Sequence, residues 1–497
     1  MSISENEVIA AGKALPVSNA IGCDEVPSFI VKDCIYLWAK PICQILNESL
    51  KQDIFPERWK SALIVPIHKA GKVNEINNYR PIAILSPFAK IYEKILYRRI
   101  FHMVKNRIST SQHGFYSGRS TVTNLIDLTQ TVAEGLDNNL QTEVIYTDFR
   151  KAFDTVNHNI LLAKLTEIGL SKKLLNLFKS YLSGRKQYVF YKGTQSSIFI
   201  PTSGVPQGSC LSTLLFAIFI NDLTKILGSG VLLFADDVKL IRHIQSATDI
   251  LLLQNQLNNF SEWCIKNELN LNVEKCAVMS FYRGSAPIHF DLFINGEKLK
   301  RVNEFKDLGV FFSKDLTFKY HINYVVSAAY KFMGFVMRNC KDFNNISTLQ
   351  TLYTILIRSR LEYASLIWSP YEQCHIKAIE DVQRRFLKFL YLKKYGQYPP
   401  RGIPEEILLK TFDLPSMEER RRMSGVKFIG NLIQGKIDCS SIVQQLNFYV
   451  PRLNSKARAT FYHQPFKKDC LKFSPIIRMC RDVNIMSSEL DIFFHKS

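Results

Sequence analysis

The sequence predicts an α+β fold, in which strands and helices mix up to about residue 320 and helices dominate afterwards. An amphipathic stretch at 87–104 predicts a helix, and the later runs at 143–149 and 231–235 are rich in β-forming residues. Beyond residue 320 the apolar spacing becomes helical, most clearly over 347–368 and 375–394. A chain of 497 residues has room for about two to four domains with sizeable cores.

The first hundred residues predict helices around a single strand. Apolar spacing near 3.6 over 29–52 predicts a helix pair that is broken at Pro41. Residues 61–69 predict a strand that Pro66 interrupts, and 87–104 predict an amphipathic helix.

The middle of the chain predicts strands and helices in turn. Residues 143–149 form a β-rich run that ends next to an acid, Asp148. The later elements are a helix at 158–169 that ends at Gly169, paired strands at 187–193 and 197–203, a strand at 231–235 and a long helix at 249–269.

The charge balance points to a polyanionic partner. The formal net charge is +20, which favours nucleic acid, although a solvated basic surface is the alternative. Eleven scattered cysteines without a C-x-x-C pair indicate a reducing, intracellular setting, in the nucleus and cytoplasm. The sequence shows neither a signal peptide nor an apolar run near the roughly 18 residues of a membrane span, and residues 211–220 predict a buried helix.

Two adjacent acids interrupt an apolar strand. In "VLLFADDVKL" (231–240), Asp236 and Asp237 repel each other and lose hydration, so a bound cation is the expected compensation. Asp148 precedes Asp236 by 88 residues (236 − 148) and also ends a β-run. If the two strands are neighbours, three carboxylates converge and could hold one or two Mg²⁺ ions for phosphoryl transfer. The alternative is a plain Asp-Asp turn.

Further segments make a family resemblance. "FADD" and "YTDFRKAFDTVNH" resemble motifs C and A of reverse transcriptases, in the style of non-LTR (LINE-like) retrotransposons and of the jockey-like insect group. The other resembling segments follow in the family's order: "PIHKAGK" (66–72), "NYRPIAILSPFAKIYEKIL" (78–96), "SQHGFYSGRSTVTNL" (111–125), "GVPQGSCLSTLLFAIFINDL" (204–223), "WCIKNELNLNVEKCAVMSF" (263–281) and "FKDLGVFFSKDLTFKYHI" (305–322). The resemblance extends over roughly residues 20–497.

The resemblance implies a right-hand polymerase that adds dNTPs to a DNA primer on an RNA template. It implies a metal site of Asp148, Asp236 and Asp237 for two Mg²⁺ ions, with Mn²⁺ able to substitute and with Asp237 the weaker ligand. It also implies that Phe153 excludes a ribose 2′-hydroxyl; the alternative is a core aromatic. It implies that residues 305–312 form a primer grip, where an ordinary hairpin is the alternative.

Polar residues of four other motifs receive roles from the same resemblance. Lys69 and Arg80 would hold the incoming triphosphate, and Lys275 would protonate the leaving pyrophosphate; all three could instead be surface cations. Gln207 would bond near the nucleotide sugar or template. The glycines beside it, Gly208 above all, would let the backbone approach a base pair, although alone they suggest only a turn.

The resemblance also suggests a domain plan: an N-terminal lead-in with helices (1–60), fingers and palm (61–320), a helical thumb (321–395) and a C-terminal region (396–497). Motif B departs from the family, because Ser212 and Thr213 stand where Gly-Pro is usual. An endonuclease domain is not evident upstream, so an endonuclease supplied elsewhere is a possible partner.

Two other functions are alternatives to reverse transcription. The first is a catalytically inactive relic that only binds nucleic acid, and the second is an RNA-dependent RNA polymerase, which usually lacks an aromatic at Phe153.

Overall fold

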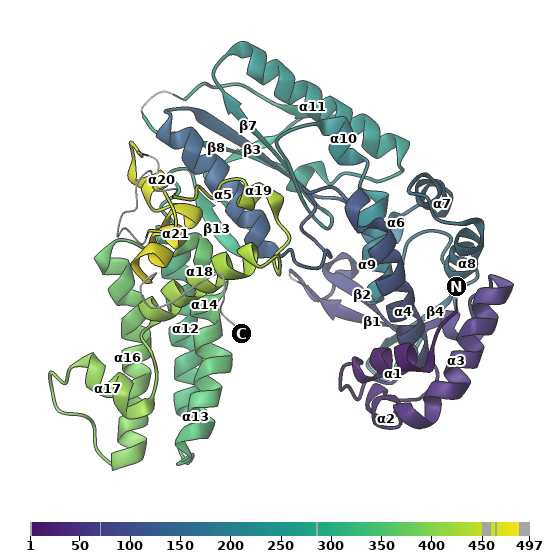
Figure 1. The fold of residues 1–497 in the computed structure, drawn as a ribbon, viewed down its shortest axis with the longest axis horizontal. Coiled ribbons are helices and arrows are strands. Elements are labelled where there is room, and N and C mark those ends of the chain that lie inside the picture. Colours follow the sequence, from purple (N-terminus) through teal and green to yellow (C-terminus); the bar gives the residue numbers. More distant parts are fainter. Residues whose placement is uncertain (1, 70, 285–286, 450–458, 463–464, 487–497) are drawn as a thin grey trace.

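The computed structural model describes residues 2–69, 71–284, 287–449, 459–462 and 465–486. A twisted sheet lies at the centre, with the N-terminal elements on one side and the long helices of the C-terminal half on the other (Figure 1). The mixture of strands and helices, with helices dominating after Lys319, confirms the predicted α+β class.

The central sheet has five strands in the order β11-β8-β3-β7-β6. All neighbouring pairs are antiparallel except β11 with β8, which is parallel. The strands are β3 Gln141–Thr147, β6 Val231–Phe234, β7 Asp237–Ile244, β8 Ala277–Phe281 and β11 Lys300–Val302.

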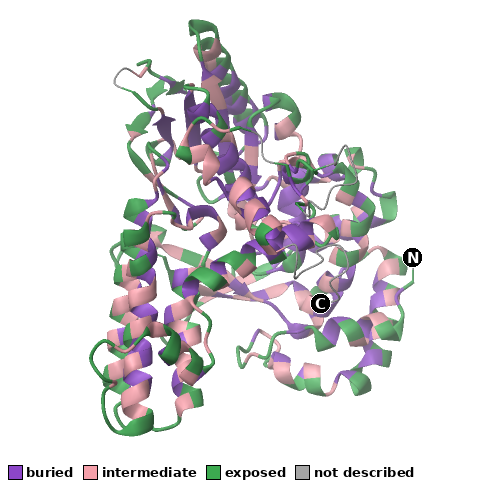
Figure 2. Cartoon of the chain, turned by 60° about the vertical axis from the view of Figure 1, so that its left-hand side comes forward, coloured by how far each residue is buried: buried purple, intermediate pink, exposed green. Residues whose placement is uncertain are grey.

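Both faces of this sheet are covered, and every residue of its middle strand, β3, is buried although Gln, Thr and Glu are among them. On β3, Ile145 joins a core that includes the N-terminal helices and α11 (Ala247–Lys266). Val144 and Tyr146 point the other way, into a core built with α5 (Thr121–Asp137) and the C-terminal helices. Figure 2 shows these buried residues running through the sheet and its flanking helices.

A second, four-stranded sheet has the order β2-β1-β4-β5. Its strands are β1 Ser61–His68, β2 Tyr79–Ile84, β4 Lys186–Tyr191 and β5 Thr194–Gln195. Pro66 does not interrupt β1 as predicted, because pairing with β4 ends at Ile64 and leaves that edge free of a ladder bond at Pro66. The predicted strand at 197–203 is reduced to a single bridge between Phe199 and Gln187.

The N-terminal helices are α1 Glu5–Lys13, α2 Ser28–Asp33, α3 Ile35–Gln52 and α4 Pro87–Val104. The break predicted at Pro41 lies instead at Cys34, and Pro41 is inside α3. The carbonyl that Pro41 cannot bond belongs to Leu37, which is 80% exposed, so water can satisfy it.

Five helices follow β3 in the chain before β6. They are α6 Ala152–Thr155, α7 His158–Glu167, α8 Lys172–Leu182, α9 Cys210–Phe219 and α10 Leu223–Leu227. Two of them, α7 and α9, match the helices predicted at 158–169 and 211–220. Residues 210–227 are long and apolar enough to cross a membrane by length and composition, but 61% of this window is buried inside the fold. The predicted burial of 211–220 is therefore confirmed.

Two small hairpin elements precede the C-terminal helices. One pairs β9 (Phe293–Ile294) with β10 (Glu297–Lys298), and the other pairs β12 (Glu304–Asp307) with β13 (Val310–Ser313). The second turns tightly at Leu308 and Gly309, which both have positive φ.

The remaining helices are α12 Lys319–Asn339, α13 Ile346–Leu352, a π-helix Tyr353–Arg358, α14 Ser359–Glu362, α15 Ser365–Trp368, α16 Gln373–Tyr395, α17 Glu405–Phe412, α18 Met417–Ile433, α19 Ser440–Val443, α20 Asp469–Lys472 and α21 Pro475–Met486. The single helix predicted at 347–368 is broken at Ala364, which has φ +50°. The break lets the Tyr363 hydroxyl donate to the Leu308 carbonyl of the β12–β13 turn at 2.8 Å.

Candidate active site

The pairing of β3 with β7 brings the predicted acids to one edge of the sheet. Thr147 at the end of β3 is in register with Val238 of β7, so Asp148 lies next to the β6–β7 turn. That turn consists of Ala235, with φ +58°, and Asp236, and Asp237 begins β7. The convergence that the sequence made conditional on neighbouring strands is therefore present in the fold.

Ionisation of Asp236 and Asp237 is unfavourable in this turn. The pKa of Asp236 is raised, first by burial and then by the charge of Asp148. For Asp237, loss of water followed by repulsion from Asp236 raises the pKa to about 7, although the residue is exposed by surface area. A divalent cation would relieve this repulsion, and carboxylate oxygens are the ligands that Mg²⁺ prefers.

Asp148 contacts two polar side chains of its own. Its Oδ2 accepts a hydrogen bond from Asn272 Nδ2 at 3.1 Å and lies 3.6 Å from Lys275 Nζ. The three carboxylates do not form a set with all ligand atoms within 4.8 Å; among the described residues, such sets occur elsewhere. Shared binding of one ion by all three acids would thus require their carboxylates to move closer together, and the donor chemistry fits Mg²⁺.

The structure places the two predicted finger cations opposite the acids. Lys69 directly follows β1, and Arg80 lies on β2, paired with Ile67. Both side chains are exposed, and their charges lower the pKa of Asp236. The hairpin therefore brings positive charge within electrostatic range of the acids, where a triphosphate would need it.

Phe153 and Gln207 lie in two segments, 153–154 and 205–207, that contact each other. The Phe153 ring stacks on Phe216 of α9 at 4.5 Å between centroids, and its carbonyl accepts from the Val205 backbone at 2.7 Å. Gln207 Nε2 donates to Asp154 Oδ1 at 2.8 Å. Both side chains are half-buried and fixed by neighbours before any substrate binds.

The glycines of "GVPQGS" are explained by close contacts with the protein's own backbone, whereas the sequence resemblance implied an approach to a base pair. Gly208 has φ +120°, and a Cβ there would lie 2.7 Å from the Ala83 carbonyl oxygen of β2. Gly204 has φ +86° and packs as closely on the Asp154 backbone. These glycines let motif B contact the protein's own backbone; a contact with a base pair remains a prediction.

The departure at Ser212 and Thr213 leaves the helix intact. Ser209 caps α9 by accepting from the backbone of Leu211 at 3.1 Å and of Ser212 at 3.2 Å. Thr213 donates to the Cys210 carbonyl at 2.6 Å. A proline is therefore not needed to begin this helix.

Sequence reasoning gave no individual role to Gln112, yet it holds the acid turn. Its Oε1 accepts from the Ala235 backbone at 3.1 Å and from Gly114 at 2.8 Å. Residues 111–114 also run beside β6, with Leu233 bonded to both Ser111 and His113. A Cβ on Gly114 would lie 2.2 Å from Ala235 N. In the sequence, Gln112 lies two residues before Gly114 in the segment 111–125. Its partner Ala235 is 123 residues away, so the sequence alone does not indicate the contact.

A buried ion pair behind the acids was also missed. Lys239 Nζ lies 2.5 Å from Asp307 Oδ2 and 2.5 Å from Asn124 Oδ1. Lys239 is 1% and Asp307 4% exposed. The pair joins the acid-bearing strand β7 to the β12–β13 hairpin.

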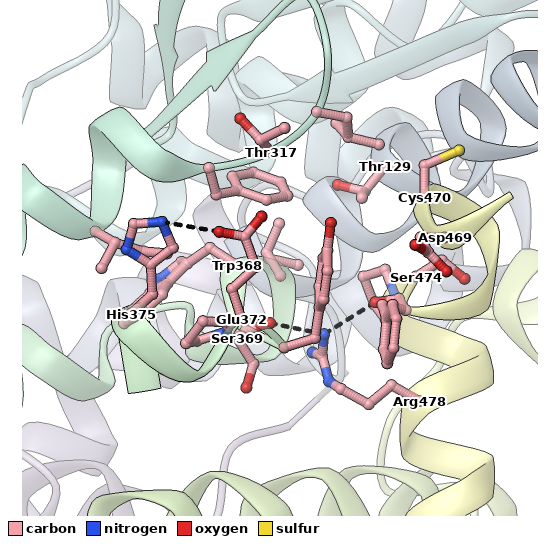
Figure 3. A pocket seen from close by; sticks show the side chains of 18 of the residues that line it. Thr129, Thr317, Trp368, Ser369, Glu372, His375, Asp469, Cys470, Ser474 and Arg478 are labelled. Atoms are coloured by element: carbon pink, nitrogen blue, oxygen red, sulfur yellow. Dashed lines mark hydrogen bonds and ion pairs between the residues drawn. The ribbon is translucent and has the colours of Figure 1, made fainter. Parts of the chain in front are cut away.

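A separate cavity of about 40 Å³ lies between the C-terminal segment and the helices near residue 370 (Figure 3). Arg478 of α21 fills its wall, donating to the carbonyls of Ser369, Phe473 and Leu366. These bonds tie the C-terminal helix to α15, and the cavity contains none of the three acids.

We predict that Mg²⁺ stabilises the protein more at about pH 8 than at about pH 6. Because the folded-state pKa of Asp237 is about 7, above the unfolded value, the folded protein holds a proton that the ion must displace below that pH. Without the ion, this group's contribution to stability falls as pH rises towards 7. Melting temperatures with and without Mg²⁺ measure the effect, and Asp237→Asn should flatten it. An equal Mg²⁺ shift at both pH values in the wild type would contradict the prediction.

Comparison with known proteins identifies the family. The model of "Reverse transcriptase (RNA-dependent DNA polymerase)" matches residues 67–336, which is 270 of 497 residues. A probable RNA-directed DNA polymerase from transposon BS of Drosophila melanogaster is 27% identical over 78% of this chain and 44% of its own length. The RNA-directed DNA polymerase from mobile element jockey of Drosophila funebris is 30% identical over 69% of this chain and 39% of its own length.

The chain thus spans less than half the length of these two relatives. An apo telomerase structure from Candida tropicalis aligns over 78% of this chain and 63% of that chain, at 16% identity and a TM-score of 0.41. The family match covers the last two residues of β1, the whole of β2, all three acids and the β12–β13 hairpin. The resemblance and the right-hand polymerase fold predicted from the sequence are confirmed, and the chain belongs to the reverse transcriptase (RNA-dependent DNA polymerase) family.

Proposed function

We propose that this chain is the RNA-directed DNA polymerase part of a non-LTR retrotransposon protein, which extends a DNA primer with dNTPs on an RNA template. One observation carries the proposal: Asp148, Asp236 and Asp237 meet at one sheet edge, within electrostatic range of Lys69 and Arg80. Nucleotidyl transfer needs carboxylates that bind metal ions and, near them, basic side chains that bind phosphates. Family membership and the relatives' names support the same reading.

In this proposal the three acids would hold two Mg²⁺ ions, for which Mn²⁺ can substitute. When bound, such ions lower the pKa of the primer hydroxyl and neutralise the pyrophosphate that leaves. The chain itself contributes position and charge. Lys69 and Arg80 would bind the triphosphate, and Arg80 can do so with two parallel hydrogen bonds.

Lys275 would supply a proton to the leaving pyrophosphate. Its side chain is 64% exposed and its ammonium group lies 3.6 Å from Asp148 Oδ2, so it can exchange its proton with water beside that acid. The same contact would be given up when Asp148 binds an ion.

Phe153 would select the sugar. Its ring is wedged between Phe216 and Phe115, at 4.5 and 6.0 Å between centroids, so it cannot move aside for a 2′-hydroxyl. Gln207, fixed by Asp154, would bond the sugar or the template nucleotide next to it.

We predict that Phe153→Val raises incorporation of rNTPs relative to dNTPs by about 10- to 100-fold, because a steric wall of this size is worth about 1–3 kcal/mol. Single-nucleotide addition with each substrate measures the ratio. Phe190→Val, which alters an exposed phenylalanine on β4, is the control and should leave the ratio unchanged. If Phe153→Val lowers both rates equally, Phe153 is a core aromatic and the selection role is wrong.

Primer extension on an RNA template tests the proposed activity. The full chain is incubated with an annealed DNA primer, Mg²⁺ and either dNTPs or rNTPs. Extension with dNTPs supports the proposal, and extension with rNTPs alone would favour an RNA polymerase. Salt-sensitive binding of the primer-template without extension would favour the inactive relic.

The proposed function also implies a partner, a compartment and a domain plan for this chain. An endonuclease supplied elsewhere would create the primer end, a step that the annealed primer bypasses. The eleven cysteines are free thiols, which suits the nucleus and cytoplasm. We retain 61–320 as fingers and palm, 321–395 as thumb, and 1–60 and 396–497 as flanking regions, with the β12–β13 hairpin as primer grip.

A further inference from the structure

One histidine, one aspartate and one cysteine, none of them among the three acids of the sheet edge, form a buried cluster. His113 precedes α5, Asp127 lies within it, and Cys439 comes from the C-terminal region just before α19. The three residues are 1%, 5% and 3% exposed. One ligand atom from each lies within 4.8 Å of the others.

The distances in this cluster match those between ligands of a zinc ion. His113 Nε2 lies 3.4 Å and Cys439 Sγ 3.8 Å from Asp127 Oδ2. Tetrahedral zinc with ordinary bond lengths separates a nitrogen and an oxygen ligand by about 3.4 Å, and a sulfur and an oxygen ligand by about 3.6 Å. The two distances to Asp127 Oδ2 are therefore close to those of a zinc site, and all three ligand atoms lie within 4.8 Å of one another.

The hydrogen bonds of His113 fix which ring nitrogen carries the proton. The Thr123 hydroxyl donates its proton to the Ser120 carbonyl at 2.8 Å, so it can only accept from His113 Nδ1, 2.9 Å away. Neutral His113 then presents a bare Nε2 to the Asp127 carboxylate, which is also an acceptor. A hydrogen bond from the other ring nitrogen is the usual support of a metal-binding histidine.

Two buried atoms of the cluster have no hydrogen-bond partner among the residues that the structure describes. They are His113 Nε2 and Asp127 Oδ1, in side chains that are 0% and 7% exposed. Asp127 Oδ2 accepts from the Ser441 hydroxyl at 2.6 Å, which orients the carboxylate. Unpartnered buried acceptors are costly, and a cation between them would satisfy both.

We propose that His113 Nε2, the Asp127 carboxylate and Cys439 Sγ bind one Zn²⁺ ion, with water or the Ser441 hydroxyl as the fourth ligand. The imidazole and thiolate favour Zn²⁺ over Mg²⁺, so this site differs in chemistry from the carboxylate site. On binding, the S–H bond of Cys439 breaks, its proton passes to water, and a Zn–S bond forms.

The ion would join two distant parts of the chain beside the acid turn. The His113 backbone donates to Leu233 of β6 at 2.9 Å, two residues before Ala235. Around Cys439, Asp438 N donates to the Gly118 carbonyl at 3.0 Å, and Arg119 Nε donates to the Asp438 carbonyl at 2.9 Å. Zinc would thus hold the C-terminal segment against the loop that supports the acid turn.

Cobalt substitution of the full chain tests the proposal. Zinc content is first measured by elemental mass spectrometry after removal of loose metal, and Co²⁺ is then exchanged in. We expect one ion per chain, a thiolate-to-cobalt charge-transfer band and strong visible bands of four-coordinate Co²⁺. Asp236→Ala, used as background, removes metal binding at the carboxylate site.

Matched variants assign the band. Cys439→Ser should lose it, whereas Cys480→Ser, which alters a cysteine equally buried at 3% exposure, should keep it. Cys439→Asp keeps an anionic ligand and should retain one zinc without the band, which guards against a Cys439→Ser variant that does not fold. A folded wild type with no tightly bound zinc and no band would overturn the proposal and leave a protonated His113–Asp127 ion pair beside an ordinary thiol.

Discussion

Replacing Asp236 by alanine is expected to slow primer extension by about a thousand-fold or more. Asp236 sits in the two-residue turn at the acid edge, where it repels Asp148 and attracts Lys69 and Arg80. Removing it takes away a metal ligand and the group around which these charges are arranged. Loss of several kcal/mol of transition-state stabilisation corresponds to this factor.

The same change should leave binding of the primer-template almost unaltered. Affinity for nucleic acid comes mainly from contacts of basic side chains with phosphates, and these remain. Single-turnover extension and a binding titration on the same preparations separate the two effects. Asp291→Asn, which alters an exposed aspartate paired with Lys298, is the control and should extend normally. A variant that extends at the wild-type rate would remove Asp236 from the proposed chemistry.

The acid edge could be predicted because its determinants are local. Asp148 and the Asp236–Asp237 pair each end an apolar β-run, and only the pairing of β3 with β7 had to be supplied. A register shift by one residue would reverse the faces of β3, so the two covered cores fix that pairing firmly. The structure adds that Asp148 is held by Asn272 and Lys275, which no local pattern indicates.

Errors in the predicted elements arose where tertiary contacts outweigh local preference. Pro41 should break a helix, but the carbonyl it leaves unpaired faces water, and α3 continues. The apolar spacing at 347–368 describes one helix, yet Ala364 adopts a left-handed conformation and Tyr363 reaches Leu308, 55 residues earlier. Periodicity reports which side is buried and cannot report such a contact.

Residues that support the site from a distance could not be found in the same way. Gln112, Asn124 and Cys439 act through partners more than a hundred residues away in the chain. Cysteine spacing gave no zinc motif, since Cys439 meets its partners only through the fold. Such residues become visible when their burial and hydrogen bonds are known.

Replacing Lys239 by methionine is expected to lower the free energy of unfolding by about 3–5 kcal/mol. Lys239 and Asp307 are both buried, and their charged atoms lie 2.5 Å apart. Burial already raises the pKa of Asp307, and the charge of Lys239 opposes this. The variant would leave the Asp307 carboxylate buried without its cation, and Asn124 without its donor. Urea unfolding followed by circular dichroism measures the loss.

Two further variants show whether the cost comes from the unpaired charge. Lys298→Met breaks an ion pair of 2.8 Å whose side chains are 61% and 52% exposed, and should cost less than about 1 kcal/mol. The double variant Lys239→Met/Asp307→Leu removes both buried charges and should recover most of the stability. If the double variant is as unstable as Lys239→Met, packing and not charge explains the loss. Recovery would mean that the unpaired charge explains the loss, so the ion pair itself contributes little net stability and serves to fix the β12–β13 hairpin to β7, the strand that begins at Asp237. Primer extension by the double variant would then measure how far activity depends on this ion pair.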